Sequence, residues 1–308
     1  MPIHRNPTSR RDFVKVTAAF GGVATILAST PAAFASASQP TRIALLSDTH
    51  IPSSPDTAAR GVNMTDNLRR TIADICKLKA PPSHLIINGD CAYLKGLPDD
   101  YANFATCLAP LDETQISLHV TMGNHDDRQS LYGALSNQRP ADNPAVLSKH
   151  ISVIETPHAN FFLLDSLFRV NVVTGELGAE QIRWLAHELD TRQDKPAVVM
   201  THHNPQFTAP TDGKQWTGIS DTQELFQVLD ARKHVRAFLY GHSHNWTHSS
   251  RGHFELINLP PVAYVFSPDR PNGWVSAELT EDAMSLELHT FDSQHPQSGE
   301  RLEVPLKA

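Results

Sequence analysis

Cysteine is scarce in this chain of 308 residues, and its three cysteines are widely spaced. That scarcity excludes a disulfide framework and a CxxC metal motif. An excess of positive charge is also missing, because the formal net charge is −7, which argues against a general binder of nucleic acid or anionic membranes. Internal repeats, heptads and low-complexity blocks do not occur, and no HExxH motif marks a one-metal peptidase. Histidine, in contrast, is unusually frequent, with 17 residues.

The cysteines are expected to play apolar roles. We predict that Cys76 and Cys107 are small buried residues. Cys91 directly follows Asp90, a candidate metal ligand, but we expect it to be a packing residue as well. With 40% hydrophobic and 19% charged residues, the chain has the composition of an ordinary globular protein with a sizeable core.

The N-terminal segment has the three-part order of an export signal. Paired arginines in Ser9–Lys15, followed by Phe13 and Lys15, resemble a bacterial twin-arginine signal. A weakly apolar stretch follows at residues 16–30, and small residues at 33–37 offer A-x-A cleavage sites. We therefore predict a signal peptide over residues 1–37 and one globular domain over residues 38–308. The protein is expected to leave the cytoplasm through the twin-arginine translocon, for the periplasm or the exterior, with retention as an uncleaved anchor as the secondary interpretation.

The body of the chain alternates short apolar runs with helical patterns. Buried strands are predicted at Ile43–Ser47, His84–Ile87, Ile116–Val120, Asn160–Leu164, Ala197–Met200 and Val235–Leu239. Helices are predicted at Leu68–Cys76, Tyr101–Leu108, Ile182–Leu189 and Thr222–Leu229. Beyond Gly241 the pattern indicates mostly strands and turns, up to about Phe291. This order predicts an α/β fold in which helices are layered around a central sheet.

Residues that bind metals follow five of the predicted strands. They are Asp48-Thr49-His50, Asn88-Gly89-Asp90, Gly123-Asn124-His125-Asp126, His202-His203-Asn204-Pro205 and Gly241-His242-Ser243-His244. Each motif alone is a weak signal, because a histidine after a strand is commonly a hydrogen-bonded loop residue. Five such motifs in order are a strong signal, since ligands of α/β sheets bind at the carboxyl ends of the strands.

The spacing within these motifs supports a shared site. Alternate side chains of a strand point the same way, so Asp48 and His50 are expected to reach one metal. The same spacing in His242 and His244 allows either one metal or, after a bend, two. A glycine (89, 123 or 241) precedes three of the proposed ligands or ligand pairs and allows sharp turns and close approach. Carboxylate, imidazole and amide donors without thiolate favour Mn, Fe or Zn.

Taken together, these motifs resemble the calcineurin-like metallophosphoesterase family, from about Arg42 to at least Thr247. Within that family the chain is most similar to the branch of class III cyclic-nucleotide phosphodiesterases and glycerophosphodiesterases. The signs of this branch are Gly123–Arg128 (GNHDDR), the strand end Leu164–Ser166 and Gly175–Leu185 (GELGAEQIRWL). The resemblance implies a four-layer αββα sandwich with two metal ions between its sheets.

The resemblance also implies a role for each motif residue. Asp48, His50, Asp90 and His244 would hold the first metal, with Asp90 bridging, and Asn124, His202 and His242 would complete the second. His125 would lie beside the phosphate without binding metal. Asp126 would orient His125 or, as the alternative, cap its loop. The family usually reads His-His-Pro-Pro, whereas Asn204 here separates His203 from Pro205, so His203 remains a rival of His202 as ligand.

The function expected from this resemblance is hydrolysis of a small phosphate ester outside the cytoplasm. A hydroxide bridging two divalent or mixed-valence metals would attack the phosphorus of a phosphodiester in line. A phosphomonoesterase or nucleotidase is the nearest alternative, and a non-catalytic metal-binding protein is a more distant one. The resemblance also suggests a homodimer. The loop Gln206–Ile219 and the chain after His244 should line the substrate pocket, where Phe207, Trp216 and Trp246 would stack on a nucleobase or pack locally.

Overall fold

The structure is a computed structural model that describes residues 39–140 and 144–307. The predicted signal peptide, residues 1–37, lies outside the described residues. Two six-stranded sheets dominate the described part, together with a small hairpin of β2 (Ala58–Ala59) and β3 (Val62–Asn63). None of the described helices combines the length and the apolar character that a membrane crossing requires.

The first sheet has the strand order β14-β13-β12-β1-β4-β5. Its strands are β1 (Thr41–Ser47), β4 (His84–Asn88), β5 (Ser117–Thr121), β12 (Gly273–Leu279), β13 (Ala283–Thr290) and β14 (Arg301–Pro305). β1, β4 and β5 run parallel, so their carboxyl ends lie together at one edge of the sheet. β12, β13 and β14 extend the sheet in antiparallel pairing beyond β1. β14 lies beyond the last strand that the sequence predicted.

The second sheet has the order β10-β11-β9-β8-β7-β6. Its strands are β6 (Ser152–Glu155), β7 (Asn160–Leu163), β8 (Ala197–Met200), β9 (Val235–Tyr240), β10 (Thr247–Arg251) and β11 (Phe254–Asn258). β7, β8, β9 and β11 are parallel, and the edge strands β6 and β10 are antiparallel to their neighbours. The sequence pattern indicated one central sheet. The two observed sheets instead match the sandwich that the family resemblance implied.

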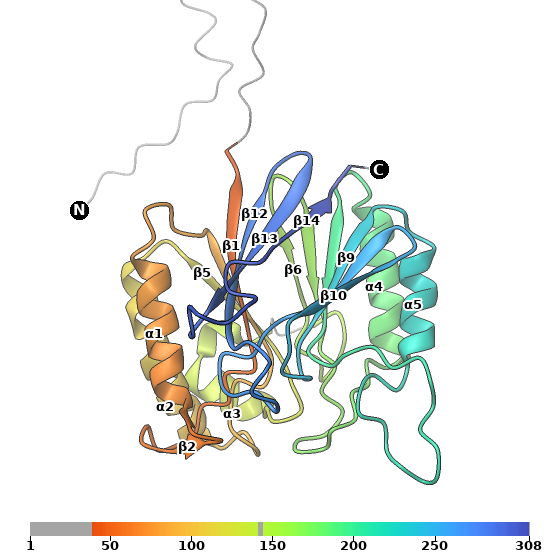
Figure 1. The fold of residues 1–308 in the computed structure, drawn as a ribbon. Coiled ribbons are helices and arrows are strands. Elements are labelled where there is room, and N and C mark those ends of the chain that lie inside the picture. The colour runs from red at the N-terminus through yellow and green to blue at the C-terminus, as the bar shows by residue number, and fades with distance from the viewer. Residues whose placement is uncertain (1–38, 141–143, 308) are drawn as a thin grey trace, which may run out of the picture. The chain divides into compact units, whose positions relative to one another are not determined.

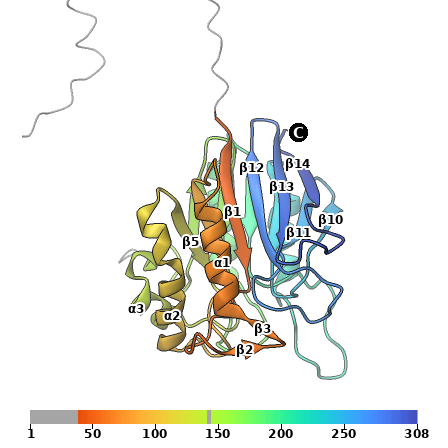
Figure 2. The same ribbon diagram turned by 60° about the vertical axis from the view of Figure 1, so that its left-hand side comes forward.

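Helices cover the outer faces of both sheets, so the chain forms four layers, as Figure 1 shows. On the first sheet lie α1 (Met64–Cys76), α2 (Pro98–Leu108) and α3 (Arg128–Ala134), with the 3-10 helices η2 (Ala109–Glu113) and η3 (Ser136–Gln138) nearby in sequence. On the second sheet lie α4 (Ala179–Thr191) and α5 (Thr222–Asp230). Figure 2 shows α1 lying along β1, with β12, β13 and β14 continuing the sheet to its side.

The alternation of side chains along the strands produces these layers. Ile43 and Leu45 of β1 belong to the hydrophobic core between the two sheets. Ala44 and Leu46, which point the opposite way, belong to the core beneath α1 and α2. The third core lies between the second sheet and its two helices. Because β1 is apolar on both faces, it can only occupy the interior of such a sandwich.

Helix α1 illustrates how local sequence sets an element. The Asn63 side chain accepts a hydrogen bond from the Asp66 N–H at 3.0 Å and caps the first turn. Leu68, Ile72 and Ile75 then recur at helical spacing and are fully buried against the first sheet. Cys76 at the end of the helix is only half-buried, so the expectation that it is a buried residue was wrong. The other two cysteines are buried, as expected.

Candidate metal centre

The carboxyl ends of five strands bring together six of the seven predicted ligands, all except Asn124, and also His125. β1, β4 and β5 come from the first sheet and β8 and β9 from the second. Three groups of side chains place all their ligand atoms within 4.8 Å of one another. These groups are Asp48, His50 and His244; His50, Asp90 and His125; and Asp90, His202 and His242. Residues nearly 200 positions apart in the chain therefore form one continuous cluster.

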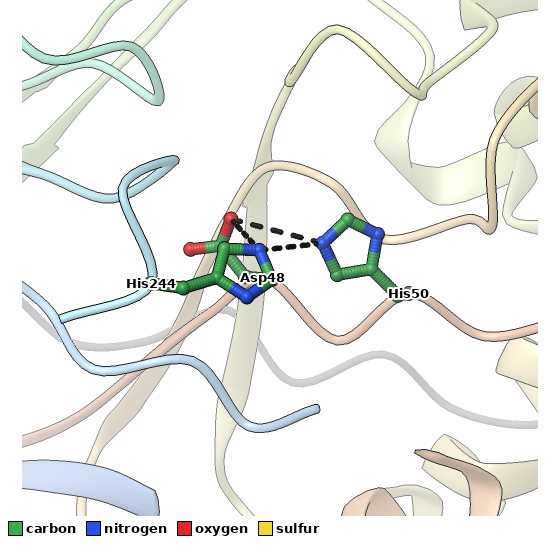
Figure 3. A group of neighbouring side chains, drawn as sticks. All are labelled: Asp48, His50 and His244. Carbon is green, nitrogen blue, oxygen red and sulfur yellow. Dashed lines mark hydrogen bonds and ion pairs between the residues drawn. The ribbon is translucent and has the colours of Figure 1, made fainter. Parts of the chain in front are cut away.

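The first group lies around Asp48, and Figure 3 shows both imidazoles turned toward this carboxylate. Asp48 Oδ1 lies 3.4 Å from His244 Nε2 and 3.9 Å from His50 Nε2. The two Nε2 atoms are 3.0 Å apart. All three side chains are almost completely buried. The arrangement presents one carboxylate oxygen and two imidazole nitrogens to a common point.

Asp90 lies between this group and the second one. Its Oδ2 is 3.3 Å from His202 Nε2, 3.7 Å from His50 Nε2 and 4.0 Å from His125 Nε2. Its other oxygen accepts a hydrogen bond from the His125 backbone N–H at 2.9 Å. Asp90 therefore belongs to both sides of the cluster, which is the position that a bridging ligand requires.

The backbone at the ligands is unusual. Asp48, His50, Asp90, His242 and His244 all have positive φ angles, between 47° and 67°. Such left-handed conformations are uncommon for residues other than glycine and are retained where the surrounding structure enforces them. Because β1 ends at Ser47, strand alternation is not what brings Asp48 and His50 together. Asp48 and His50 do lie together, as expected, but the left-handed turns bring them together and the alternation of a strand does not.

The same turns separate His242 from His244. His242 joins Asp90 and His202, whereas His244 joins Asp48 and His50. This divergence is one of the two arrangements that the spacing allowed. The backbone of this segment is held in place because the His242 N–H lies 3.1 Å and 3.2 Å from the two Asp48 carboxylate oxygens.

Two glycines allow the close packing of these turns. A Cβ on Gly123 would lie 2.8 Å from Asp90 Cγ and closer still to the Asp90 backbone nitrogen. A Cβ on Gly241 would lie 2.7 Å from Asp48 Oδ2. Since real side chains essentially never approach so closely, any larger residue at either position would displace a candidate ligand.

Backbone carbonyls orient the imidazole rings. His202 Nδ1 lies 2.9 Å from Asn88 O, His244 Nδ1 lies 2.6 Å from Tyr264 O, and His242 Nε2 lies 3.0 Å from Thr217 O. In each ring the nitrogen at the carbonyl carries the proton, so the other nitrogen offers a lone pair toward the cluster. This is how metal-binding histidines are commonly held.

Several buried polar atoms of the five motifs have no hydrogen-bond partner. They are His50 Nδ1, Asn124 Oδ1, His202 Nε2 and His203 Nε2. A buried acceptor without a partner costs free energy, on the order of 1–3 kcal/mol. Coordination of cations by Asn124 Oδ1 and His202 Nε2 would satisfy these two atoms. The donor set of carboxylates, imidazoles and an amide oxygen therefore fits two metal ions.

The electrostatics of the cluster also favour cations. Burial alone would lower the pKa of His202, but the carboxylates of Asp90 and Asp48 outweigh burial and raise it to about 10. Burial would raise the pKa of the Asp90 carboxyl, yet His202 and His125 hold it well below its usual range. Because the carboxylates stabilise a proton on His202 so strongly, they would also stabilise a metal ion in its place.

His203 has a different environment from His202. Its Nδ1 lies 2.8 Å from Ser166 Oγ, and its ring lies against His242 with centroids 4.6 Å apart. It belongs to none of the three ligand groups. The geometry therefore supports His202 as the ligand. Cys91 likewise belongs to no group, and burial raises the pKa of its thiol well above the usual value.

Asp126 does not contact the His125 ring. Its carboxylate accepts hydrogen bonds from the Tyr101 hydroxyl at 2.8 Å and from three backbone N–H groups, those of Gly123, Cys91 and Ala92. The His125 ring is instead held by its Nδ1, 2.7 Å from Leu94 O. These contacts support the alternative in which Asp126 caps its loop. The assignment of Asp126 as a catalytic residue is therefore corrected to a structural role.

The aromatic residues of the predicted pocket are mostly packing residues. Trp246 is 1% exposed and belongs to the core between the sheets, so it is not available to stack on a nucleobase. Phe207 packs edge-on against Phe226 and lies beneath Arg251. Sequence reasoning missed Tyr264 and Phe266, whose rings lie against His50 and His244. The only signal for them was the expectation that the chain after His244 lines the pocket.

Comparison with known proteins places this site in a family. Residues 41–246 match the family model of calcineurin-like phosphoesterases, so the chain belongs to that family and is a metal-dependent phosphoric ester hydrolase. A 3′,5′-cyclic-nucleotide phosphodiesterase of Nostoc is 26% identical over 240 residues, 78% of this chain and 85% of the relative. The 3′,5′-cyclic adenosine monophosphate phosphodiesterase of Pseudomonas aeruginosa is 25% identical over 249 residues, 79% of this chain and 84% of the relative.

A similar fold is known from solved structures. A dimetal phosphatase from Danio rerio superposes with a TM-score of 0.65 at 16% identity, covering 87% of this chain and 99% of that one. The likeness confirms the metallophosphoesterase fold that the sequence motifs implied.

Proposed function

We propose that the protein is an exported, dinuclear-metal phosphodiesterase that hydrolyses 3′,5′-cyclic nucleotides. The observation that carries the proposal is the shared position of Asp90, whose Oδ2 lies within 4.0 Å of the ring nitrogens of His50, His202 and His125. One carboxylate between two groups of ligands is the arrangement of a two-metal hydrolase. The named activities of the relatives support the substrate class.

The ligands divide between the two metals as follows. Asp48, His50, Asp90 and His244 would hold one ion, and Asp90, Asn124, His202 and His242 the other. When bound, the two ions would activate a water for attack on phosphorus and neutralise charge on the phosphoryl oxygens. Mn, Fe and Zn all suit these donors, and elemental analysis of the purified protein identifies which are present.

His125 is the residue best placed to contact the substrate. Its Nδ1 faces Leu94 O, so its Nε2 faces the cluster. The side chain is 20% exposed, unlike the buried ligands Asp48, Asp90 and His202, and can therefore be reached by a phosphate ester. His125 would stabilise the phosphoryl charge and, as an imidazolium, donate its Nε2 proton to the leaving oxygen.

The experiment that tests the function compares three substrates. The purified chain, loaded with Mn²⁺, is assayed with cyclic AMP, bis(p-nitrophenyl) phosphate and p-nitrophenyl phosphate, and its metals are counted. We expect turnover of both diesters with about two metals per chain. A preference for the monoester would replace the proposal with the phosphomonoesterase or nucleotidase alternative. Size-exclusion chromatography of the same sample tests the proposed homodimer.

Export is the second part of the proposal. It rests on the twin-arginine motif at Arg10 and Arg11, with Phe13 after the pair. Fractionation of cells that express the wild type and a variant with both arginines replaced by lysine tests it. We expect the wild type outside the cytoplasm and the variant inside. An equal distribution of the two proteins would contradict this route.

A further inference from the structure

An arginine and two aromatic rings form a wall beside the metal centre. Phe266 stacks on the ring of His244 with centroids 4.3 Å apart, and Tyr264 stacks on His50 at 5.3 Å. The guanidinium carbon of Arg60 lies 5.0 Å from the Phe266 ring and 5.7 Å from the Tyr264 ring. Arg60, Tyr264 and Phe266, called the arginine wall below, therefore adjoin two candidate metal ligands.

The aromatic part of this wall is held rigidly. The segment that leads into Tyr264 and Phe266 runs along the end of β1. There the N–H groups of Val262 and Ala263 donate to Ser47 O at 2.8 Å and Asp48 O at 3.0 Å. The Asn67 side chain of α1 donates to the carbonyls of the same two residues, at 2.9 Å and 3.2 Å. These four hydrogen bonds fix the backbone that immediately precedes Tyr264 next to the candidate ligand Asp48.

Arg60 lies at the tip of the hairpin β2–β3, from which its side chain reaches Tyr264 and Phe266. Both residues of its turn, Arg60 and Gly61, have positive φ angles of 50° and 79°, which suits a tight two-residue hairpin turn. Arginine is an unfavourable choice at such a position, where glycine or asparagine is preferred. The arginine at this position therefore calls for a reason other than the stability of the turn.

The guanidinium has no anionic partner. Within residues 39–140 and 144–307, the Arg60 side chain forms no ion pair or hydrogen bond, and Arg60 is exposed. It also lines a surface hollow of about 190 Å³ together with Val265 and Asp292. Asp292 makes no ion pair with it. The N–H groups of a guanidinium that is stacked on aromatic rings remain free to bind a ligand.

We infer that the arginine wall is the subsite that recognises the nucleobase of the substrate. This inference rests on the proposed function, because it takes the ester bound at the metals to be a nucleotide. A base offers a flat face for stacking on the guanidinium, which Phe266 supports from the other side, and ring acceptors for the guanidinium N–H groups. A choline headgroup would be repelled by Arg60, and a glycerol group has no flat face.

A pair of ligands that differ only in the base isolates this contribution. Adenosine 5′-monophosphate and ribose 5-phosphate carry the same sugar phosphate, and their dissociation constants for the metal-loaded full chain are measured by calorimetry. We expect the nucleotide to bind about 10- to 100-fold more tightly, the range that base stacking supplies. Arg60→Ala and Phe266→Ala should each bring this ratio close to one. Arg60→Lys should retain only part of it, because lysine keeps the charge but loses the flat fork.

The chain offers a matched control. Arg70 is also an exposed arginine over an aromatic ring, 5.4 Å from the Phe291 centroid, and on α1 it pairs with Asp74 and belongs to none of the ligand groups. Arg70→Ala should leave the ratio of the two dissociation constants unchanged. Because Arg60 is exposed and forms no hydrogen bond, Arg60→Ala should also unfold at the temperature of the wild type.

The outcomes separate this inference from the proposed function. If Arg60→Ala leaves the ratio of the two dissociation constants unchanged, the inference is overturned. If the ratio is unchanged because both ligands bind equally more weakly, Arg60 is a phosphate contact instead. The proposed function is decided by the wild type alone. If it binds the nucleotide through the wall but leaves cyclic AMP intact, the diesterase function fails while the base subsite stands.

Discussion

Gly123→Ala should disable the site through a single methyl group. The added Cβ would lie 2.8 Å from Asp90 Cγ, whereas carbon atoms pack at about 3.5–4.0 Å, so one of the two must move by about 1 Å. Asp90 cannot turn away cheaply, because the same Cβ meets its backbone nitrogen and its Oδ1 already accepts the His125 N–H. The residue that would bridge the two metals is therefore displaced.

The expected loss can be estimated from that displacement. A misplacement of about 1 Å in a catalytic group typically costs roughly 100-fold in rate. Crowding in a packed interior also costs about 1–3 kcal/mol of stability. We therefore expect kcat/KM to fall about 100-fold, with fewer than two metals per chain and a lower unfolding temperature. Steady-state kinetics, elemental analysis and thermal unfolding measure these three quantities.

Gly133→Ala provides the control for the same chemical change. Gly133 lies in α3, and a Cβ there would meet nothing within 4 Å. This variant should keep its activity. It should also unfold at a slightly higher temperature, because alanine within a helix is favoured over glycine by about 0.5–1 kcal/mol. The steric reasoning would be refuted if Gly123→Ala kept wild-type kcat/KM with both metals bound.

Three further predictions address individual residues. Asp90→Asn should lower metal content and activity together, and a variant that kept both would exclude a bridging role. His125→Ala should keep its metals and lose about 100- to 10,000-fold in kcat; a metal-free protein would show that His125 is a ligand. His202→Ala should lose one metal by elemental analysis, whereas His203→Ala should keep two, because only His202 faces Asp90. The opposite pattern would reverse this assignment.

The ligand positions could be predicted from sequence because each depends on local order. A buried apolar run followed by a turn and a polar metal-binding side chain is visible in the residues themselves, as at β1 and Asp48. Parallel strands place their carboxyl ends at one edge, so the motifs within each sheet converge once its strands are assigned. The type of metal site follows from the side chains that converge.

Other features depend on contacts that no local pattern encodes. Whether one sheet or two would form depended on which strands pair, as in the register of β1 with β12 more than 200 residues later. The role of Asp126 depended on Tyr101 and the backbone at Cys91 and Ala92, which surround its carboxylate. The burial of Trp246 depended on the space between the sheets.

The sequence by itself determined the family, the order of the ligand motifs and the donor chemistry, because these reside in residue types and short spacings. Only the tertiary structure decided that His202 rather than His203 faces Asp90, since Asn88 O orients one ring and Ser166 the other. It also placed Arg60 above Phe266 beside His244. Ring orientation and long-range proximity are set by hydrogen bonds and packing between distant segments, which a linear pattern does not contain.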